Sequence, residues 1–362
     1  MRDMQLRATD MQIPSTGTSP RQAHTGCLAC GESHFDGEQS FVSALDRRLD
    51  LTSWLAEELG EIPTLTFREC KGCRTVSQLP LGSQAMYTRW YQNPRYDFTR
   101  GLGYADPVSE GPRHALLALG ILSRHVSGGS RQLLDVGCGP GHFLRIASRR
   151  GWTALGVDPA EHRLPLGLNA VERRAFEEFS AGDRRFDVVS FLDVFEHFIN
   201  PSAVLDKVTN ILSDRGLLLL EVPNVRSLYA RALTTRWWFG FEHLFYYSAA
   251  GLSALLESCG FEVLEITTPD LNLLSLEGLF RFRLFGEEEV WGRQYGNSHH
   301  GWPELKTLLR AGSRPLNYFP NALGARLLLG DQLFAVARKR PTPLSASPDE
   351  RAVKRELVSA QL

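Results

Sequence analysis

The chain has 362 residues, of which 43% are hydrophobic and 22% charged, and its formal net charge at pH 7 is −1. That length allows one large α/β domain and an additional module, while the near-neutral charge gives no electrostatic argument for binding nucleic acid or an anionic membrane. The sequence has no apolar run long enough to span a bilayer and no secretory signal at its N-terminus, so we expect a cytoplasmic protein with reduced thiols.

Two matched cysteine pairs define the first region expected to be ordered, residues 26–82, after a polar tail at 1–25 that we expect to be disordered. Each Cys-x-x-Cys pair places two thiolates on one tight turn, and two such turns complete a tetrahedral zinc site. The gap of about 40 residues exceeds the usual spacing but allows a zinc-ribbon-like module with residues 49–59 folded over it. A closed site of this kind is structural, and its predicted ligands are Cys27, Cys30, Cys70 and Cys73.

Three other interpretations of the cysteines are weaker. His24 or His34 lies close enough in sequence to replace one thiolate, but four sulfur ligands are the simpler set. Disulfides conflict with a reducing compartment, and four unrelated thiols would not explain the matched pairs. Zinc therefore remains the predicted occupant.

Residues 83–130 are predicted to be a linker and a leading helix. The linker contains the aromatic and basic stretch 86–96, which we expect to pack at the interface between the two regions rather than to cover a cofactor. A helix over residues 112–125 then leads into the first buried strand.

The stretch Leu133–Leu144 predicts a strand, a glycine turn and the start of a helix that continues to Arg149. Three glycines allow a sharp turn and close approach of a ligand, and the helix N-terminus offers free N–H groups. Asp158 ends the next strand, where a carboxylate can accept both hydroxyls of a ribose. This pattern predicts a nucleoside-containing cofactor. The third glycine comes one residue earlier than in a dinucleotide fingerprint, which disfavours a nicotinamide-dependent oxidoreductase.

Strands and helices alternate through residues 131–339, which predicts an α/β domain with a Rossmann-like, mostly parallel sheet and helices on both faces. Ligands are then expected at the carboxyl ends of the strands. A final strand over 330–339 is expected to run antiparallel at the sheet edge. The parallel strands are predicted near 133–137, 153–158, 169–172, 187–192 and 216–222.

Four segments together resemble class I S-adenosylmethionine (SAM)-dependent methyltransferases over residues 131–268. Besides the glycine loop they are Phe186–Pro201 (FDVVSFLDVFEHFINP), Gly216–Asn224 (GLLLLEVPN) and Glu242–Phe261. The resemblance is to the ubiquinone-type and sugar-modifying branches. The added cysteine pairs make the chain similar to deoxysugar C-methyltransferases, although it lacks the further C-terminal domain usual in those enzymes.

The resemblance implies a SAM site in which the glycine loop wraps the methionine end and Asp158 holds the ribose. Arg174 stands where relatives often carry an acid, so adenine recognition is expected from backbone near Phe176 and Glu177. Cys138 is interpreted as a packing residue. The implied cofactor contacts are Asp135, Gly137, Gly139, Gly141, Asp158, Phe176, Glu177 and Asp193.

Three residues are candidates for a catalytic role at the methyl acceptor. His197 follows the fourth strand and is expected near the methyl group, where an imidazole suits proton transfer near neutral pH. Its alternative role is to orient the loop before Asn200 and Pro201. The resemblance implies that Glu242 and His243 face the acceptor.

The predicted reaction is methyl transfer to a small molecule such as a sugar nucleotide or secondary metabolite. Alternatives are a lipid, quinone or macromolecular acceptor, or a non-enzymatic protein in which the zinc and cofactor regions bind a partner. Residues 270–325 form an aromatic-rich insertion, interpreted as a helical appendage, a substrate lid or a membrane-touching patch. Residues 340–362 are expected to be a disordered tail.

Overall fold

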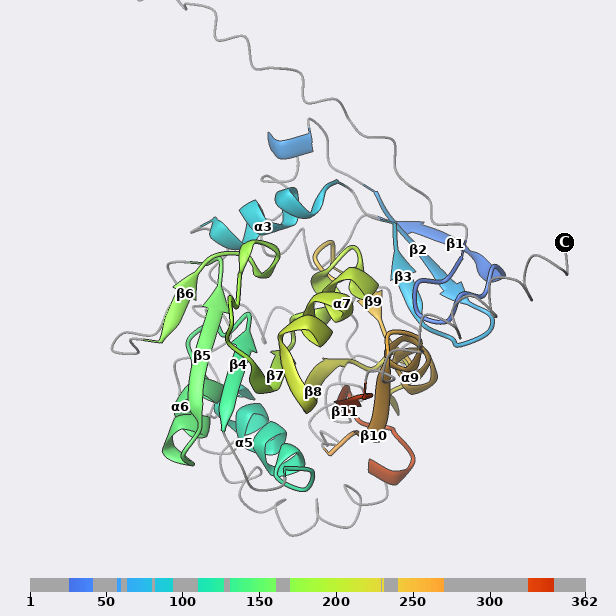
Figure 1. The fold of residues 1–362 in the computed structure, drawn as a ribbon. Coiled ribbons are helices and arrows are strands. Elements are labelled where there is room, and N and C mark those ends of the chain that lie inside the picture. The colour runs from blue at the N-terminus through green and yellow to red at the C-terminus, as the bar shows by residue number, and fades with distance from the viewer. Residues whose placement is uncertain are drawn as a thin grey trace, which may run out of the picture.

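The computed structural model describes residues 26–41, 57–59, 64–79, 82–93, 110–126, 131–160, 170–228, 230, 240–269 and 325–341. Within these ranges the chain forms a large twisted sheet flanked by helices and a small sheet beside it (Figure 1). The predictions for the N-terminal tail, for residues 49–56 and for nearly all of the 270–325 insertion and the C-terminal tail lie outside the described residues.

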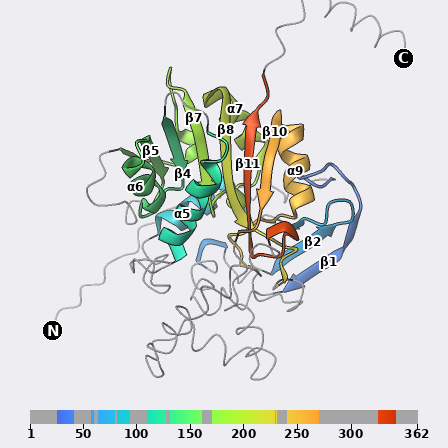
Figure 2. The same cartoon turned by 90° about the horizontal axis from the view of Figure 1, so that it is seen from below.

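The large sheet has seven strands in the order β10-β11-β8-β7-β4-β5-β6 (Figure 2). Strand β4 pairs in parallel with both β5 and β7, β5 with β6, and β7 with β8. The predicted α/β fold with a mostly parallel sheet is therefore confirmed. The strands are β4 Gln132–Val136, β5 Thr153–Asp158, β6 Val171–Arg173, β7 Phe186–Leu192, β8 Leu212–Pro223, β10 Phe261–Thr267 and β11 Gln332–Lys339.

The prediction that the last strand lies at the sheet edge is wrong. Strand β11 is antiparallel as expected, but it lies between β8 and β10, and β10 forms the edge. Residues Leu333–Ala337 are all buried, as befits an inner strand, whereas β10 is buried only at Phe261. Strand β6 also begins two residues later than expected.

Helices cover both faces of the large sheet. Neighbouring strand residues such as Leu133 and Leu134 point to opposite faces, because side chains alternate along a strand. Leu133 packs with helices α5 (Glu110–Leu122) and α6 (His142–Arg149), and Leu134 belongs to the core cluster that includes α7 (Pro201–Ile211) and α9 (Ala249–Ser258). Asn200 caps α7 by accepting a hydrogen bond from Ala203 N at 3.1 Å. No described helix is both long and apolar enough to cross a membrane.

The small sheet joins the cysteine-bearing region to the rest of the molecule. Its strand order is β1-β2-β3-β9, and β9 (Phe245–Tyr246) comes from the domain that carries the large sheet. The other strands are β1 Phe35–Phe41, β2 Leu65–Cys70 and β3 Val76–Gln78. Residues of both sheets belong to one hydrophobic cluster. The module therefore packs against the domain and shares a hydrophobic core with it.

Candidate functional site

The glycine loop follows β4 at the carboxyl edge of the large sheet. Gly137, Gly139 and Gly141 have φ angles of 68°, 46° and 72°, in the left-handed region that favours glycine. A Cβ on Gly137 would also overlap the side chain of Val194. The loop therefore requires these glycines, and it lies directly against the segment that follows β7.

Asp158 ends β5 and holds the glycine loop through its carboxylate. Its Oδ2 accepts a hydrogen bond from Gly139 N at 2.8 Å, and its Oδ1 accepts one from Ala160 N at 2.7 Å. These bonds tie the end of β5 to the glycine loop. The ribose-binding role of Asp158 stays a prediction.

Asp135, near the end of β4, is buried. Ser190 Oγ donates a hydrogen bond to Asp135 Oδ1 at 2.7 Å. Burial raises the pKa of Asp135 to about 7, with a further increase from the nearby charge of Asp158. The group therefore carries only part of a negative charge near neutral pH, and a bound cation would increase its ionisation.

The loop after β6 carries the residues expected near an adenine. Phe176 is buried in an aromatic group with Phe191 and Phe198, so its side chain packs in the core. Lys207 on α7 donates hydrogen bonds to the carbonyl oxygens of Phe176 and Glu177, at 2.6 Å and 2.9 Å. This lysine fixes the backbone of the loop.

Arg174, the departure from the family pattern, does not replace the missing acid. Its Nε lies 3.2 Å from Glu172 Oε2, and its side chain is 45% exposed. The backbone of the Phe176–Glu178 turn is therefore the part of this loop best placed to contact a base.

His197 ends the short 3₁₀-helix η3 (Phe195–His197) just after β7. Its Nδ1 lies 2.9 Å from the carbonyl oxygen of Glu242 and 2.8 Å from Tyr91 Oη. A carbonyl can only accept, so the contact with Glu242 O requires a proton on Nδ1, whereas the Tyr91 hydroxyl can either accept from Nδ1 or donate to it. In the tautomer that bonds to Glu242, the lone pair of His197 is on Nε2.

Glu242 and His243 precede β9 and lie beside His197. Trp90 Nε1, on helix α3 (Gln84–Gln92), donates to Glu242 Oε2 at 3.2 Å. The ring centroids of His243 and His197 are 4.8 Å apart. Burial lowers the pKa of His243 well below its usual range, with a smaller effect from His197, so this imidazole is neutral at physiological pH.

Further acids surround the two imidazoles. Glu196 is fully buried, and neither of its carboxylate oxygens has a hydrogen-bond partner among the described residues. Burial raises its pKa well above the usual range, and the charges of Asp193, Glu221 and Glu242 add to that shift. Glu221 lies 2.5 Å from His114 Nδ1, which α5 brings across the sheet. This side of the site can hold protons on carboxyl groups as well as on imidazoles.

Two sets of three side chains have ligand atoms within 4.8 Å of one another at these strand ends. Each set mixes imidazole nitrogen with carboxylate oxygen, donors that suit a divalent transition metal as well as a shared proton. The sets are Glu196, His197 and His243, and His114, Asp193 and Glu221.

The four cysteines of the module converge as the spacing predicted. Cys27 Sγ lies 3.8 Å from Cys73 Sγ, and Cys30 Sγ lies 3.6 Å from Cys70 Sγ. Tetrahedral zinc with Zn–S bonds of about 2.3 Å would separate its sulfurs by about 3.8 Å, so the four thiols fit such an ion. The hydrogen bond between Cys27 and Cys73 lowers the pKa of Cys73 and raises the pKa of Cys27, so this pair of sulfurs shares a proton.

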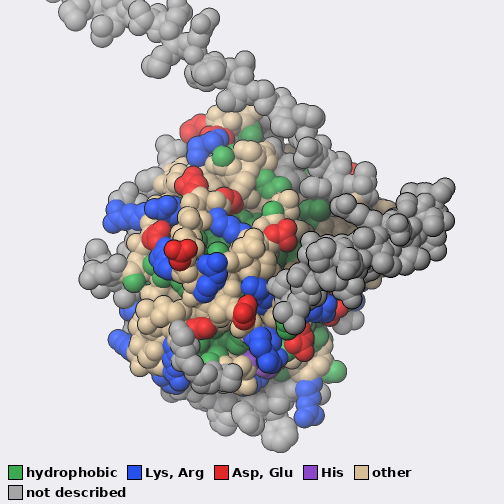
Figure 3. Space-filling view, in the orientation of Figure 1, with side chains coloured by type: hydrophobic (Ala, Val, Ile, Leu, Met, Phe, Trp, Pro, Cys, Tyr) green, Lys and Arg blue, Asp and Glu red, His purple; other side chains and the backbone are tan. Residues whose placement is uncertain are grey.

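The structure brings the predicted residues together in three groups: the glycine loop with Asp158, the pair of imidazoles with Glu242, and the four cysteines. The first two groups meet at Val194, which contacts Gly137 and lies three residues before His197. The roles assigned to these residues stay predictions. On the face in Figure 3, basic and acidic side chains are interspersed, in keeping with the small net charge.

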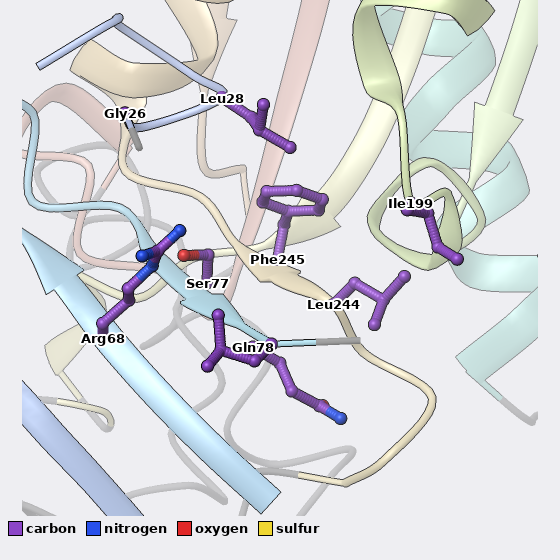
Figure 4. A pocket seen from close by; sticks show the side chains of 9 residues that line it. Gly26, Leu28, Arg68, Ser77, Gln78, Ile199, Leu244 and Phe245 are labelled. Atoms are coloured by element: carbon purple, nitrogen blue, oxygen red, sulfur yellow. The ribbon is translucent and has the colours of Figure 1, made fainter. Parts of the chain in front are cut away.

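A small hollow lies where the module meets the domain (Figure 4). Leu28 of the module, Phe245 of β9 and Ile199 after η3 give it apolar walls, and Arg68 and Ser77 supply polar atoms. It marks the surface along which the two regions are in contact.

Sequence reasoning missed several residues that lie around His197 and Glu242. Trp90 and Tyr91, which bond to these residues, belong to the aromatic stretch that was expected to pack between the two regions. Glu196 stands next to His197, and that neighbouring position was the signal that could have found it. Glu221 sits in an apolar strand and His114 on a distant helix, and no local pattern connects them.

Residues 112–266 match the sequence model of a family described as a methyltransferase domain. A ubiquinone biosynthesis O-methyltransferase from Pseudomonas fluorescens is 29% identical over 125 residues, covering 31% of this chain and 54% of that relative. The same enzyme from Methylococcus capsulatus is 30% identical over 127 residues, covering 32% and 53%. The chain thus spans about half the length of these curated relatives.

Solved structures with related folds are more distant in sequence. A SAM-dependent methyltransferase from Thermotoga maritima is 15% identical with a TM-score of 0.40, covering 67% of this chain and 98% of that one. Magnesium protoporphyrin IX methyltransferase from Synechocystis is 15% identical with a TM-score of 0.37, covering 52% and 90%. The fold assignment rests on the observed sheet and not on these similarities.

Proposed function

We propose that this chain, whose residues 112–266 match a methyltransferase domain, is a class I SAM-dependent methyltransferase that transfers the methyl group of SAM to a small-molecule acceptor. The observation that carries the proposal is the juxtaposition of the glycine loop and Asp158 with the partly buried imidazoles His197 and His243 at one edge of the sheet. A purely structural turn would not need both groups of residues.

The cofactor half of the site consists of the glycine loop, Asp135, Asp158 and the turn at Phe176. We assign Asp158 to the ribose hydroxyls and the loop to the methionine end of SAM. Asp135 lies beneath the loop, and Asp193 after β7 is assigned to the methionine pocket. Lys207 supports the adenine side through the carbonyls of Phe176 and Glu177.

When bound, SAM would supply the methyl group and its sulfur would be the leaving group. The residues of this chain would align the acceptor and take its proton. We propose that Nε2 of His197 or the neutral imidazole of His243 accepts the proton that the methyl acceptor loses.

Glu242 has a positioning role at the acceptor in this scheme. Its carbonyl oxygen favours the tautomer of His197 with the proton on Nδ1, and its carboxylate, held by Trp90, lies 4.0 Å from His243 Nε2. A proton taken up by either imidazole is stabilised by this nearby carboxylate.

We propose a sugar nucleotide or another secondary metabolite as the acceptor, because the motifs together with the cysteine pairs resemble sugar-modifying methyltransferases. The same domain in ubiquinone biosynthesis O-methyltransferases makes a quinone-like acceptor the alternative. We also propose structural zinc in the four-cysteine site, supported by the sulfur–sulfur distances of 3.6 Å and 3.8 Å.

Incubation of the protein with methyl-labelled SAM and a fractionated extract of the source organism tests the proposal. Label in small anionic compounds is the expected result. Label in lipid, protein or RNA would keep the chemistry and overturn the acceptor class. Bound SAM with no label in any fraction would favour a non-enzymatic role.

A further inference from the structure

The four-cysteine module is connected by backbone hydrogen bonds to the strand that follows Glu242 and His243. Strands β3 and β9 pair antiparallel, with Val76 opposite Tyr246 and Ser77 opposite Phe245. Gln78 N also donates to Leu244 O at 2.8 Å. The first residue after the Glu242–His243 pair is therefore bonded directly to the module.

The turn that carries the second cysteine pair also contacts the start of α9. Ser248 Oγ donates a hydrogen bond to the carbonyl oxygen of Cys73, and Ser248 N donates to Thr75 Oγ1 at 3.3 Å. Close packing leaves no room for a side chain at Gly251, where a Cβ would overlap Thr75 Oγ1 and lie 3.0 Å from Cys73 Sγ. The turn that carries Cys73 is thus in direct contact with the N-terminus of α9.

The segment between these two contacts is held on its other side by the site itself. Leu244 N donates to Glu196 O at 3.0 Å, and His197 Nδ1 bonds to Glu242 O. Residues 242–248 therefore lie between the cysteine turn and η3. Movement of the turn would shift Glu242 and His243 relative to His197.

The cofactor half depends on different contacts. Gly137 N and Cys138 N donate to Val157 O, and Gly139 N donates to Asp158, so the glycine loop is held by β5. These bonds do not pass through the module.

We infer that the Cys70–Thr75 turn is a positioning element of the acceptor half: with its cysteines holding a metal, it sets the place of Glu242 and His243 through Thr75, Ser248 and the β3–β9 pairing. Thr75 and Ser248 are positioning residues that act through the 242–248 segment. The inference rests on the proposed role of Glu242 and His243 at the methyl acceptor. The contacts from which it is argued are independent of that role. It gives the module a function in the reaction beyond stabilising its own fold.

The test compares Thr75→Val with Thr209→Val, a matched hydroxyl deletion on α7, where Thr209 Oγ1 bonds only locally to Asp206 O. Ser248→Ala removes the bond from Ser248 Oγ to Cys73 O together with the α9 cap on Gly251 N, and chelator treatment of the wild type perturbs the turn without a substitution. Each protein is measured for metal content, for SAM affinity by calorimetry, and for hydrogen exchange of peptides covering 242–250 and 133–145. Metal content shows whether a variant has also lost its ion.

We expect Thr75→Val to increase exchange in 242–250 by about 10-fold, the equivalent of one lost hydrogen bond. Ser248→Ala, which loses two bonds, and chelation should each increase it further. Peptides 133–145 and SAM affinity should change by less than about 2-fold, as in Thr209→Val. The rate of methyl transfer into the labelled fraction should be lower in the variants whose hydrogen exchange in 242–250 is faster. Unchanged exchange in 242–250 after chelation, or equal loosening of 133–145, would overturn the inference. Hydrogen exchange and SAM binding can be measured without a methyl acceptor. These measurements therefore test the inference even if no methyl transfer is found.

Discussion

The cofactor half and the acceptor half of the site are built in different ways. Asp135, the three glycines and Asp158 lie within one β-turn-α-β unit, and the bond from Gly139 N to Asp158 spans 19 residues. The bond from Tyr91 to His197 spans 106 residues, and the bond from Trp90 to Glu242 spans 152. The first half is a local motif, whereas the second exists only after the module, α3 and the sheet have packed together. Substitutions should therefore separate cofactor binding from turnover.

Glu242→Gln should give the largest effect, on the acceptor half alone. Glutamine keeps the shape and the backbone carbonyl that orients His197, but it removes the negative charge beside His243. We expect turnover to fall by up to about 10⁴-fold, the order of loss when the carboxylate that stabilises a catalytic imidazolium becomes an amide, with SAM affinity within about 2-fold of wild type. Labelled methyl transfer and calorimetry measure the two quantities. A parallel loss of SAM affinity would show that the two halves are not separable.

Asp158→Ala should produce the opposite pattern. It removes the hydrogen-bond acceptor for Gly139 N and for the ribose, so SAM should bind about 10- to 100-fold more weakly, the equivalent of one hydrogen bond to a charged group. Asp187→Ala is the matched control, since Asp187 accepts from Gln132 N at the other end of β4. Equal SAM titration curves for wild type and Asp158→Ala would refute the ribose assignment.

Asp135→Asn should change the pH dependence of stability. The folded-state pKa of Asp135 is raised to about 7 from 3.8, so the folded protein binds the proton more tightly than the unfolded chain between those values. This group therefore destabilises the fold as pH rises from about 4 to 7. Relative to wild type, Asp135→Asn should gain up to a few kcal/mol of unfolding free energy at pH 8 and little at pH 4, as measured by denaturant titration. A constant difference across this range would contradict the burial effect.

Lys207→Met should have the smallest effect. It deletes the charge that holds the carbonyls of Phe176 and Glu177, and we expect SAM affinity to fall about 2- to 5-fold with turnover at saturation unchanged. Lys207→Arg should restore part of the affinity. Lys339→Met serves as a control, because Lys339 Nζ makes a similar bond to Leu212 O at 3.2 Å away from the proposed cofactor site. Loss of turnover at saturating SAM would assign Lys207 to the acceptor half instead.

The same contrast explains what the sequence could and could not predict. The glycine loop, Asp158 and the cysteine pairs could each be predicted from a short stretch of sequence, because a single strand or turn determines their positions. The inner position of β11, the β3–β9 pairing and the Trp90–Glu242 bond depend on contacts between segments far apart in the chain. His114 and Glu221 lie in unremarkable helix and strand sequence, and only tertiary packing brings them to 2.5 Å.

A calorimetric titration of the wild-type protein with SAM, repeated in the presence of excess NAD⁺, tests the central claim most directly. The account predicts one SAM per chain and an affinity that NAD⁺ does not change, because the glycine loop and Asp158 are assigned to the methionine and ribose parts of SAM. Absence of SAM binding, or its displacement by NAD⁺, would contradict the account and make the nicotinamide-dependent alternative the better explanation of the loop.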